Sequence, residues 1–190
     1  HSVLRRHAHA IKRSLGTRRP YDPDLILTVG DVTREVLEKS PGLGAVGLAT
    51  FGTHRRHGAA AAEVRDPTPD CLVLPEGLAA ESMHLFGFAL ECARRRPDVR
   101  FIFRTHPILP FETIVPKLDG GRALPSNVEI SRNAAIEDDF KRSGHLLYRG
   151  SSTAIYGILA GLKAFYLGKP GEMEIDPLWE LPLWREHVYS

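Results

Sequence analysis

From residue 70 onward, segments with the pattern of strands alternate with segments with the pattern of helices. The predicted strands are CLVLP (71–75), VRFIF (99–103), NVEIS (127–131), HLLYR (145–149) and KAFYLG (163–168). The predicted helices run from about residue 80 to residue 96, after Phe111, and through AIEDDFKRS and SSTAIYGILAG. Mostly apolar strands that alternate with helices are typical of a parallel sheet covered on both faces and joined by right-handed crossovers. We therefore predict an α/β fold for this region.

The first 69 residues repeat this pattern in a shorter form. Apolar positions on one side predict a helix over residues 3–15, and LILTVG, VTREVLEKS and GAVGLATFG then indicate a strand, a helix and a strand. Residues 52–69 combine glycine, proline, a His/Arg cluster and an alanine run, which is typical of a linker. We expect two parts: residues 1–69, a partial α/β unit with its linker, and residues 70–190, a Rossmann-like domain.

The charge distribution limits the classes of binding partner that this chain can have. The formal net charge is +2, with arginines and histidines concentrated early in the chain and acids later. The basic stretches lack the interleaved aromatic side chains of a base-stacking surface, so we expect no nucleic-acid binding. A solvated helix, a phosphate group and an anionic membrane face all remain compatible with them. No apolar run approaches the ~20 residues that a membrane helix needs.

Cysteine and histidine usage gives no indication of a metal or a disulfide. Cys71 and Cys92 lie in apolar patterns, without a CxxC motif or a secretory apolar region, which predicts reduced thiols in a cytoplasmic protein. Two histidine pairs lack carboxylate or cysteine partners at metal-ligand spacing, and we expect them to be solvated: His7 with His9, and His54 with His57.

Ligands of open α/β sheets lie beyond the carboxyl ends of the strands, so the segments directly after the strands are the candidates for a site. The segment RGSSTA follows the fourth predicted strand. Gly150 frees the backbone, and the hydroxyls of Ser151, Ser152 and Thr153 precede a helix whose N-terminus attracts anions. These residues predict a phosphate-binding loop, although one serine that simply caps the helix is the competing interpretation. The segment matches neither GxxxxGK[ST] nor GxGxxG.

The segment RTHP follows the second predicted strand. The Arg104 guanidinium can bind two phosphate oxygens, and the His106 imidazole can donate a hydrogen bond or a proton to a phosphate leaving group. Pro107 favours an extended conformation for His106 and thereby ends the strand. A partly exposed loop histidine without a function is the alternative interpretation.

The segment PEG places a carboxylate directly after the first predicted strand. Glu76, followed by Gly77, can accept a hydrogen bond from a ribose hydroxyl or act on an acceptor. The competing interpretation is an acidic residue that favours the positive end of the next helix.

In their order and spacing, RTHP and YRGSSTAIYGILAGLKAFYL resemble the donor-binding domain of GT-B glycosyltransferases. The closest similarity is to bacterial capsule and surface-polysaccharide enzymes: polysialyltransferases and related sialyltransferases, transferases of the acidic sugar Kdo and, more remotely, glycerophosphotransferases of teichoic acid synthesis. The resemblance covers roughly residues 70–180, and DLILTVGDVTREVLEKS is similar to the closing β-α-β unit of the acceptor domain in these enzymes.

The resemblance implies a metal-independent transfer from a nucleotide sugar, CMP-linked or else UDP-linked, to a surface polysaccharide or glycolipid. It gives His106 the role of binding or protonating the donor phosphate, with Ser151 and Ser152 holding that phosphate and Arg104 nearby. It also implies a cytoplasmic protein that contacts the inner face of the inner membrane peripherally.

Two features depart from the family pattern. Fewer than 70 residues precede the second predicted domain, too few for a complete first domain, and residues 1–70 lack the acidic-acidic-glycine motif that carries the general base in the sialyltransferase-like members. The chain also begins with His1 rather than Met, so we expect the native N-terminus to lie further upstream. A non-catalytic nucleotide-binding or assembly module of a polysaccharide system, and a sugar-nucleotide epimerase, are the alternative functions.

Overall fold

The computed structural model describes residues 23–39, 46–52, 68–172, 174–179 and 181–190. The chain divides into two compact units, His1–Gly58 and Ala59–Ser190. This division falls inside the stretch predicted as a linker, and the predicted boundary before residue 70 stays a prediction. The helix predicted over residues 3–15 and the two histidine pairs predicted to be solvated lie outside the described residues.

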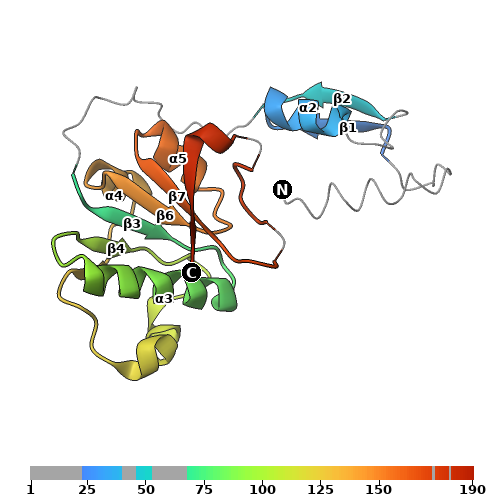
Figure 1. The fold of residues 1–190 in the computed structure, drawn as a ribbon. Coiled ribbons are helices and arrows are strands. Elements are labelled where there is room, and N and C mark those ends of the chain that lie inside the picture. The colour runs from blue at the N-terminus through green and yellow to red at the C-terminus, as the bar shows by residue number, and fades with distance from the viewer. Residues whose placement is uncertain (1–22, 40–45, 53–67, 173, 180) are drawn as a thin grey trace. The chain divides into compact units, whose positions relative to one another are not determined.

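The second unit is built on a six-stranded sheet in which every pair of neighbouring strands is parallel (Figure 1). The strands follow the order β5-β4-β3-β6-β7-β8 across the sheet. Their bounds are β3 Cys71–Leu74, β4 Phe101–Phe103, β5 Val128–Ile130, β6 His145–Tyr148, β7 Lys163–Gly168 and β8 Arg185–Tyr189. Relative to chain order this is the sequence 3-2-1-4-5-6 of a Rossmann-like sheet. The predicted fold class is confirmed.

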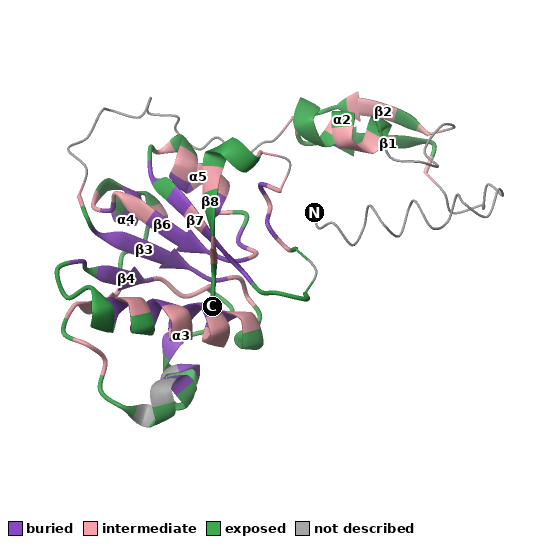
Figure 2. Cartoon of the chain, viewed as in Figure 1, coloured by how far each residue is buried: buried purple, intermediate pink, exposed green. Residues whose placement is uncertain are grey.

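Helices cover both faces of this sheet because the central strands are apolar on both faces. In β3, Cys71 and Val73 belong to the core cluster under α3 (Ala79–Arg95), on the face that also carries η1 and η2. The alternate residues of β3 belong to a second cluster under α4 (Ile136–Lys141) and α5 (Ala154–Leu159). Figure 2 shows the central strands as a buried layer between these helices. Successive side chains of a strand point to opposite faces of the sheet, and here both sets are apolar. The sheet therefore has a core on each face, instead of one buried and one solvated face.

Two segments differ from the prediction. The helix predicted after Phe111 is instead a pair of 3-10 helices, η1 (Phe111–Thr113) and η2 (Val115–Gly121), since prolines remove backbone donors there and Gly120 has a φ of +64°. Strand β8, which follows the 3-10 helix η3 (Pro182–Trp184), was not predicted. Its sequence REHVY lacks an apolar run because β8 lies at the edge of the sheet.

The first unit contains the predicted β-α-β segment. Strands β1 (Leu25–Thr28) and β2 (Gly47–Thr50) pair in parallel, and α2 (Asp31–Glu38) connects them. The side chains of Leu25 and Leu27, two residues apart in β1, are more than half exposed.

Both cysteines are free, as predicted. Burial raises the pKa of the Cys71 thiol to about 12, so this side chain is an unreactive part of the core. Among the helices in the described ranges, none is long and apolar enough to cross a bilayer.

The close approach of the backbone at Gly144 gives a stability prediction. A β-carbon added at Gly144 would lie 2.1 Å from the Thr68 carbonyl oxygen, whereas one added at Gly87 in α3 would meet nothing within 4 Å. We expect Gly144→Ala to destabilise the protein by more than about 2 kcal/mol, because the clash is with rigid backbone. The matched control Gly87→Ala should stabilise it by up to about 1 kcal/mol through helix propensity. Urea unfolding of both variants measures the difference, and equal effects would show that the approach at Gly144 is not as close as described.

Candidate functional site

Three of the predicted segments meet at the carboxyl edge of the sheet. Because β3 pairs in parallel with both β4 and β6, the residues that follow these three strands leave the sheet at the same edge. Chain order reverses between β3 and β6, since β4 and β5 lie on one side of β3 while β7 and β8 lie beyond β6. Ligands of doubly wound sheets bind at this kind of reversal.

Glu76, directly after β3, lies against the loop after β6. A β-carbon added at Gly150 would be 2.5 Å from Glu76 Oε2 and 2.9 Å from its Cδ. Gly150 also has a φ of +69°, so glycine is needed there for both conformation and space. Burial and the negative charge of Glu81 raise the pKa of the Glu76 carboxyl, and Arg149 opposes them.

His106, after β4, lies beside the turn that follows Glu76. Its Nδ1 is 3.2 Å from the position of a β-carbon added at Gly77, and the exposed side chain of Ile108 is 2.8 Å from the same point. The backbone N–H of Ile108 donates to His106 Nδ1 over 3.4 Å. A ring nitrogen that accepts a hydrogen bond carries no proton in the neutral imidazole, so this contact favours a proton on Nε2.

The segment after β6 forms a turn before α5. Ser151 is buried, Ser152 is exposed and Thr153 is half-buried, and helix α5 begins only at Ala154. The helix predicted from Ser151 is therefore shorter than expected, and its dipole can contribute little. Any binding of an anion here depends on the hydroxyls and backbone N–H groups of the loop.

Arg104 is engaged in a contact network within the protein. Its Nη1 donates to the Asp139 carboxylate over 2.6 Å and to the Asn133 carbonyl oxygen over 3.0 Å, and its Nη2 donates to the Ala134 carbonyl oxygen over 3.2 Å. The guanidinium thus ties the end of β4 to α4 and to the loop before it. These contacts direct the guanidinium toward Asp139. The role of Arg104 as a phosphate ligand stays a prediction.

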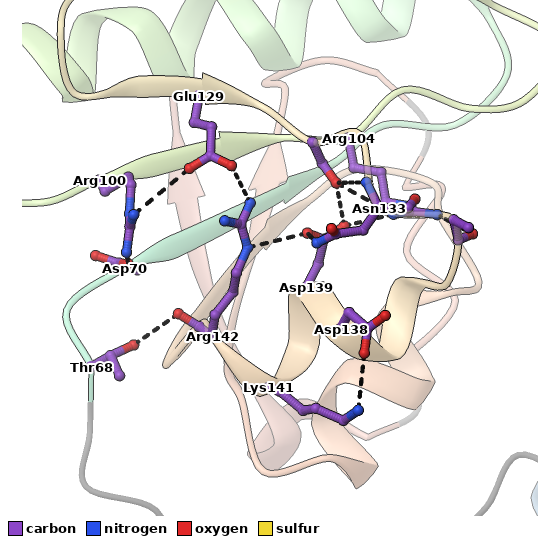
Figure 3. A network of polar contacts seen from close by, with 12 residues as sticks. Thr68, Asp70, Arg100, Arg104, Glu129, Asn133, Asp138, Asp139, Lys141 and Arg142 are labelled. Carbon is purple, nitrogen blue, oxygen red and sulfur yellow. Dashed lines mark hydrogen bonds and ion pairs between the residues drawn. The ribbon is translucent and has the colours of Figure 1, made fainter.

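Asp139 is fully buried and is the centre of this network (Figure 3). Besides Arg104, it accepts hydrogen bonds from the Ser131 hydroxyl (2.6 Å), the Asn133 side chain (2.8 Å) and Arg142 Nε (3.3 Å). Arg142 continues the network to Glu129, and Arg100 joins Glu129 to Asp70. These donors satisfy the oxygens of the buried carboxylate.

Arg149 is the residue of this edge that the sequence analysis did not single out. Only 2% of its side chain is exposed, although it carries a charge. It binds Glu81 on α3 through Nε, the Leu167 carbonyl oxygen through Nη1 (2.9 Å) and Glu172 through Nη2 (2.9 Å). The sequence signal for Arg149 was its position: like Arg104, it directly follows a buried strand. The residue joins three segments of the carboxyl edge.

A second buried carboxylate, Asp176, anchors the edge strand. It accepts a hydrogen bond from the Tyr148 hydroxyl over 2.7 Å and forms an ion pair with Arg185. Ligand atoms of Glu174, Asp176 and His187 lie within 4.8 Å of one another, which is close enough to share a metal ion. Asp176 already serves Tyr148 and Arg185, so we assign it a structural role.

Comparisons with known proteins identify the fold. No family model matches the chain, and no curated protein matches its sequence. Among solved structures, the chain is similar to the pneumococcal O-GlcNAc transferase GtfA in complex with UDP and GlcNAc (TM-score 0.51, 11% identity, 76% of this chain). It is also similar to the glycotransferase of kitacinnamycin (TM-score 0.54, 12% identity, 98% of this chain) and to TarM (TM-score 0.56, 8% identity, 87% of this chain).

These likenesses concern the fold. The chain spans 30% of the length of the GtfA chain, 49% of the kitacinnamycin enzyme and 33% of TarM. The chain shares a Rossmann-like α/β fold with these solved structures.

The network around Asp139 gives a prediction with a matched control one residue away. Asp139→Asn should destabilise the protein by about 3 kcal/mol, because two arginines lose the charge of a buried acceptor. Asp138→Asn removes only the exposed ion pair with Lys141 and should cost at most about 0.5 kcal/mol. Thermal and urea unfolding of both variants test this, and a small effect of Asp139→Asn would mean that the network does not stabilise the fold.

Proposed function

We propose that this chain is the donor-binding part of a glycosyltransferase that moves a sugar from a nucleotide sugar to an acceptor hydroxyl. The observation that carries the proposal is the meeting of the segments after β3, β4 and β6 at the reversal of strand order, where Glu76 lies against the backbone at Gly150 and His106 lies beside Gly77. The fold shared with solved glycosyltransferases supports the same function.

The donor phosphate is assigned to the loop after β6. Gly150 gives the backbone its left-handed turn, and the hydroxyls of Ser151, Ser152 and Thr153 are the donors within that loop. His106 is assigned to the phosphate oxygen that leaves the sugar, because its Nε2 proton is not used by the contact with Ile108. Arg104 is assigned to holding the strand end from which His106 follows.

The reaction is a displacement at the anomeric carbon. The acceptor oxygen forms a bond to this carbon, the bond between the carbon and the phosphate oxygen breaks, and its electron pair leaves with the nucleotide. Hydroxyl donors and the imidazole stabilise the charge that grows on the departing phosphate. The proton of the acceptor hydroxyl goes to a base, which the resemblance to sialyltransferase-like enzymes assigns to the acceptor-side domain. The scheme requires no metal ion.

The resemblance to capsule enzymes suggests the substrates. We propose a CMP-linked or UDP-linked sugar as donor and a surface polysaccharide or a glycolipid as acceptor. An acceptor of this kind would bring the protein to the cytoplasmic face of the inner membrane. A non-catalytic nucleotide-binding module would bind the same donors without turnover, and a sugar-nucleotide epimerase would release an epimer.

Nucleotide binding by the full chain tests the proposal. We expect isothermal titration calorimetry to show binding of CMP or UDP, or of a sugar conjugate of one of them. His106→Ala should weaken that binding by about tenfold or more, because one hydrogen bond to a charged phosphate is lost.

The control is His145→Ala, which removes an imidazole from the opposite end of a strand. His145 begins β6, at the amino edge of the sheet, and its variant should bind the nucleotide with unchanged affinity. Absence of binding to every nucleotide, or equal losses in the two variants, would overturn the proposed site. In a protein that also contains the acceptor-side domain, binding without transfer or release of the sugar in the presence of acceptor oligosaccharide would favour the non-catalytic alternative.

A further inference from the structure

The proposed phosphate loop has a carboxylate directly against it. Glu76 Oε2 lies within 2.5 Å of the position that a side chain at Gly150 would take, so the carboxyl group occupies the space next to the backbone of this loop. A negative charge in this place opposes the binding of a phosphate. A site that binds phosphate here must therefore neutralise the carboxyl group or tolerate its charge.

The surroundings do not neutralise Glu76 by pairing. Within the described part of the chain, no hydrogen bond or ion pair reaches its carboxylate, although its backbone carbonyl accepts from the Ser82 hydroxyl. Arg149, whose charge lowers the pKa of Glu76, is committed to Glu81, Glu172 and the Leu167 carbonyl oxygen. The titratable and charged groups of the neighbouring elements are Glu81 and His84 on α3, His106 after β4, Arg149 at the end of β6, and Lys169 with Glu172 after β7.

The balance of these groups makes the Glu76 carboxyl easier to protonate than an exposed carboxyl. Burial and Glu81 raise the pKa of Glu76, and Arg149 offsets only part of this effect. A phosphate in the adjacent loop adds a further negative charge and raises the pKa again. A protonated carboxyl can also donate a hydrogen bond to a phosphate oxygen, which a carboxylate cannot do.

We propose that phosphate binding at the loop Gly150–Thr153 is coupled to the uptake of one proton by Glu76, which makes the site prefer a phosphodiester to a phosphomonoester. This inference rests on the proposed function. The proton comes from solvent and moves to the Glu76 carboxylate, and no covalent bond of the ligand changes.

The preference follows from the charges of donor and product. Each phosphate of a nucleotide sugar has two substituents and one negative charge, whereas the terminal phosphate of the released nucleotide gains a second charge with a pKa of about 6. Near neutral pH, Glu76 therefore opposes the product more than the donor. The carboxyl group helps the product nucleotide to leave after transfer.

The sign of the pH dependence is fixed by the coupling. Between the pKa of Glu76 in the free protein and its higher pKa in the complex, binding takes up a proton, and affinity falls as pH rises. Below both pKa values the carboxyl is protonated in both states, and affinity is independent of this group. UDP-GlcNAc and a CMP-linked sugar do not titrate in this range, so proton uptake with these probes belongs to the protein.

The experiment is calorimetry of the full chain with these two nucleotide sugars and with UDP and CMP, between about pH 5.5 and about pH 8.5. Each titration is repeated in buffers with different ionisation enthalpies, so that proton uptake is counted directly. With wild-type protein and the two nucleotide sugars we expect proton uptake on binding, and affinity that falls as pH rises. Glu76→Gln should abolish that uptake and tighten the binding of UDP or CMP by about tenfold at the alkaline end. The affinity for the two nucleotide sugars should increase by a smaller factor.

Two further variants separate the contribution of Glu76 to the pH dependence from those of other charged groups. Glu91→Gln removes the same charge from an exposed position later in α3, and it should keep the wild-type proton uptake and pH profile. His106→Ala in the Glu76→Gln background removes the imidazole after β4, and any pH dependence that it eliminates belongs to His106. Proton uptake in Glu76→Gln equal to that of wild type would overturn this inference while nucleotide binding remains. No binding by either protein at any pH would overturn the proposed function and the inference with it.

Discussion

The parallel pairing of β3 with β6 is the contact on which the candidate site depends. Residues Cys71–Leu74 lie in register with His145–Tyr148, although about 70 residues separate the two strands in the chain. Because both strands end at the same edge, the turn after β3 meets the loop after β6, and the contact between Glu76 and Gly150 results from this register. A shift of β6 by one residue would move its side chains to the other face and remove that contact.

Two arginines hold this edge together, one after β4 and one after β6, the strands on either side of β3. Arg149 ties the start of α3 to β7 and to the segment after it, and Arg104 ties the end of β4 to α4. Burying a guanidinium is costly unless its donors are satisfied, and in both cases carboxylates and carbonyl oxygens satisfy them. The loops at this edge are therefore fixed by charged contacts, while hydrophobic packing fixes the strands below them.

The sequence was sufficient for the architecture but not for the partners of each side chain. Apolar runs predicted β3, β4, β6 and β7 because these strands are buried on both faces, whereas β8 was missed because an edge strand can carry charged residues. Spacing also placed Glu76, His106 and Ser151 correctly after their strands. It could not show that Arg104 turns toward Asp139, since the direction of an arginine depends on a carboxylate 35 residues away in the chain.

The network of Arg104 bears on His106, which lies two residues further along the chain. A histidine that follows a strand on a free loop would sample many positions, and a hydrogen bond to a departing phosphate would then cost conformational entropy. Here the backbone before His106 is held by the contacts of Arg104 with Asp139 and with the carbonyl oxygens of Asn133 and Ala134. The same arginine that seemed suited to grip phosphate thus limits the motion of the imidazole. In the proposed function its positive charge serves the site by fixing geometry, and Glu76 and the hydroxyl-bearing loop determine how well the donor phosphate binds.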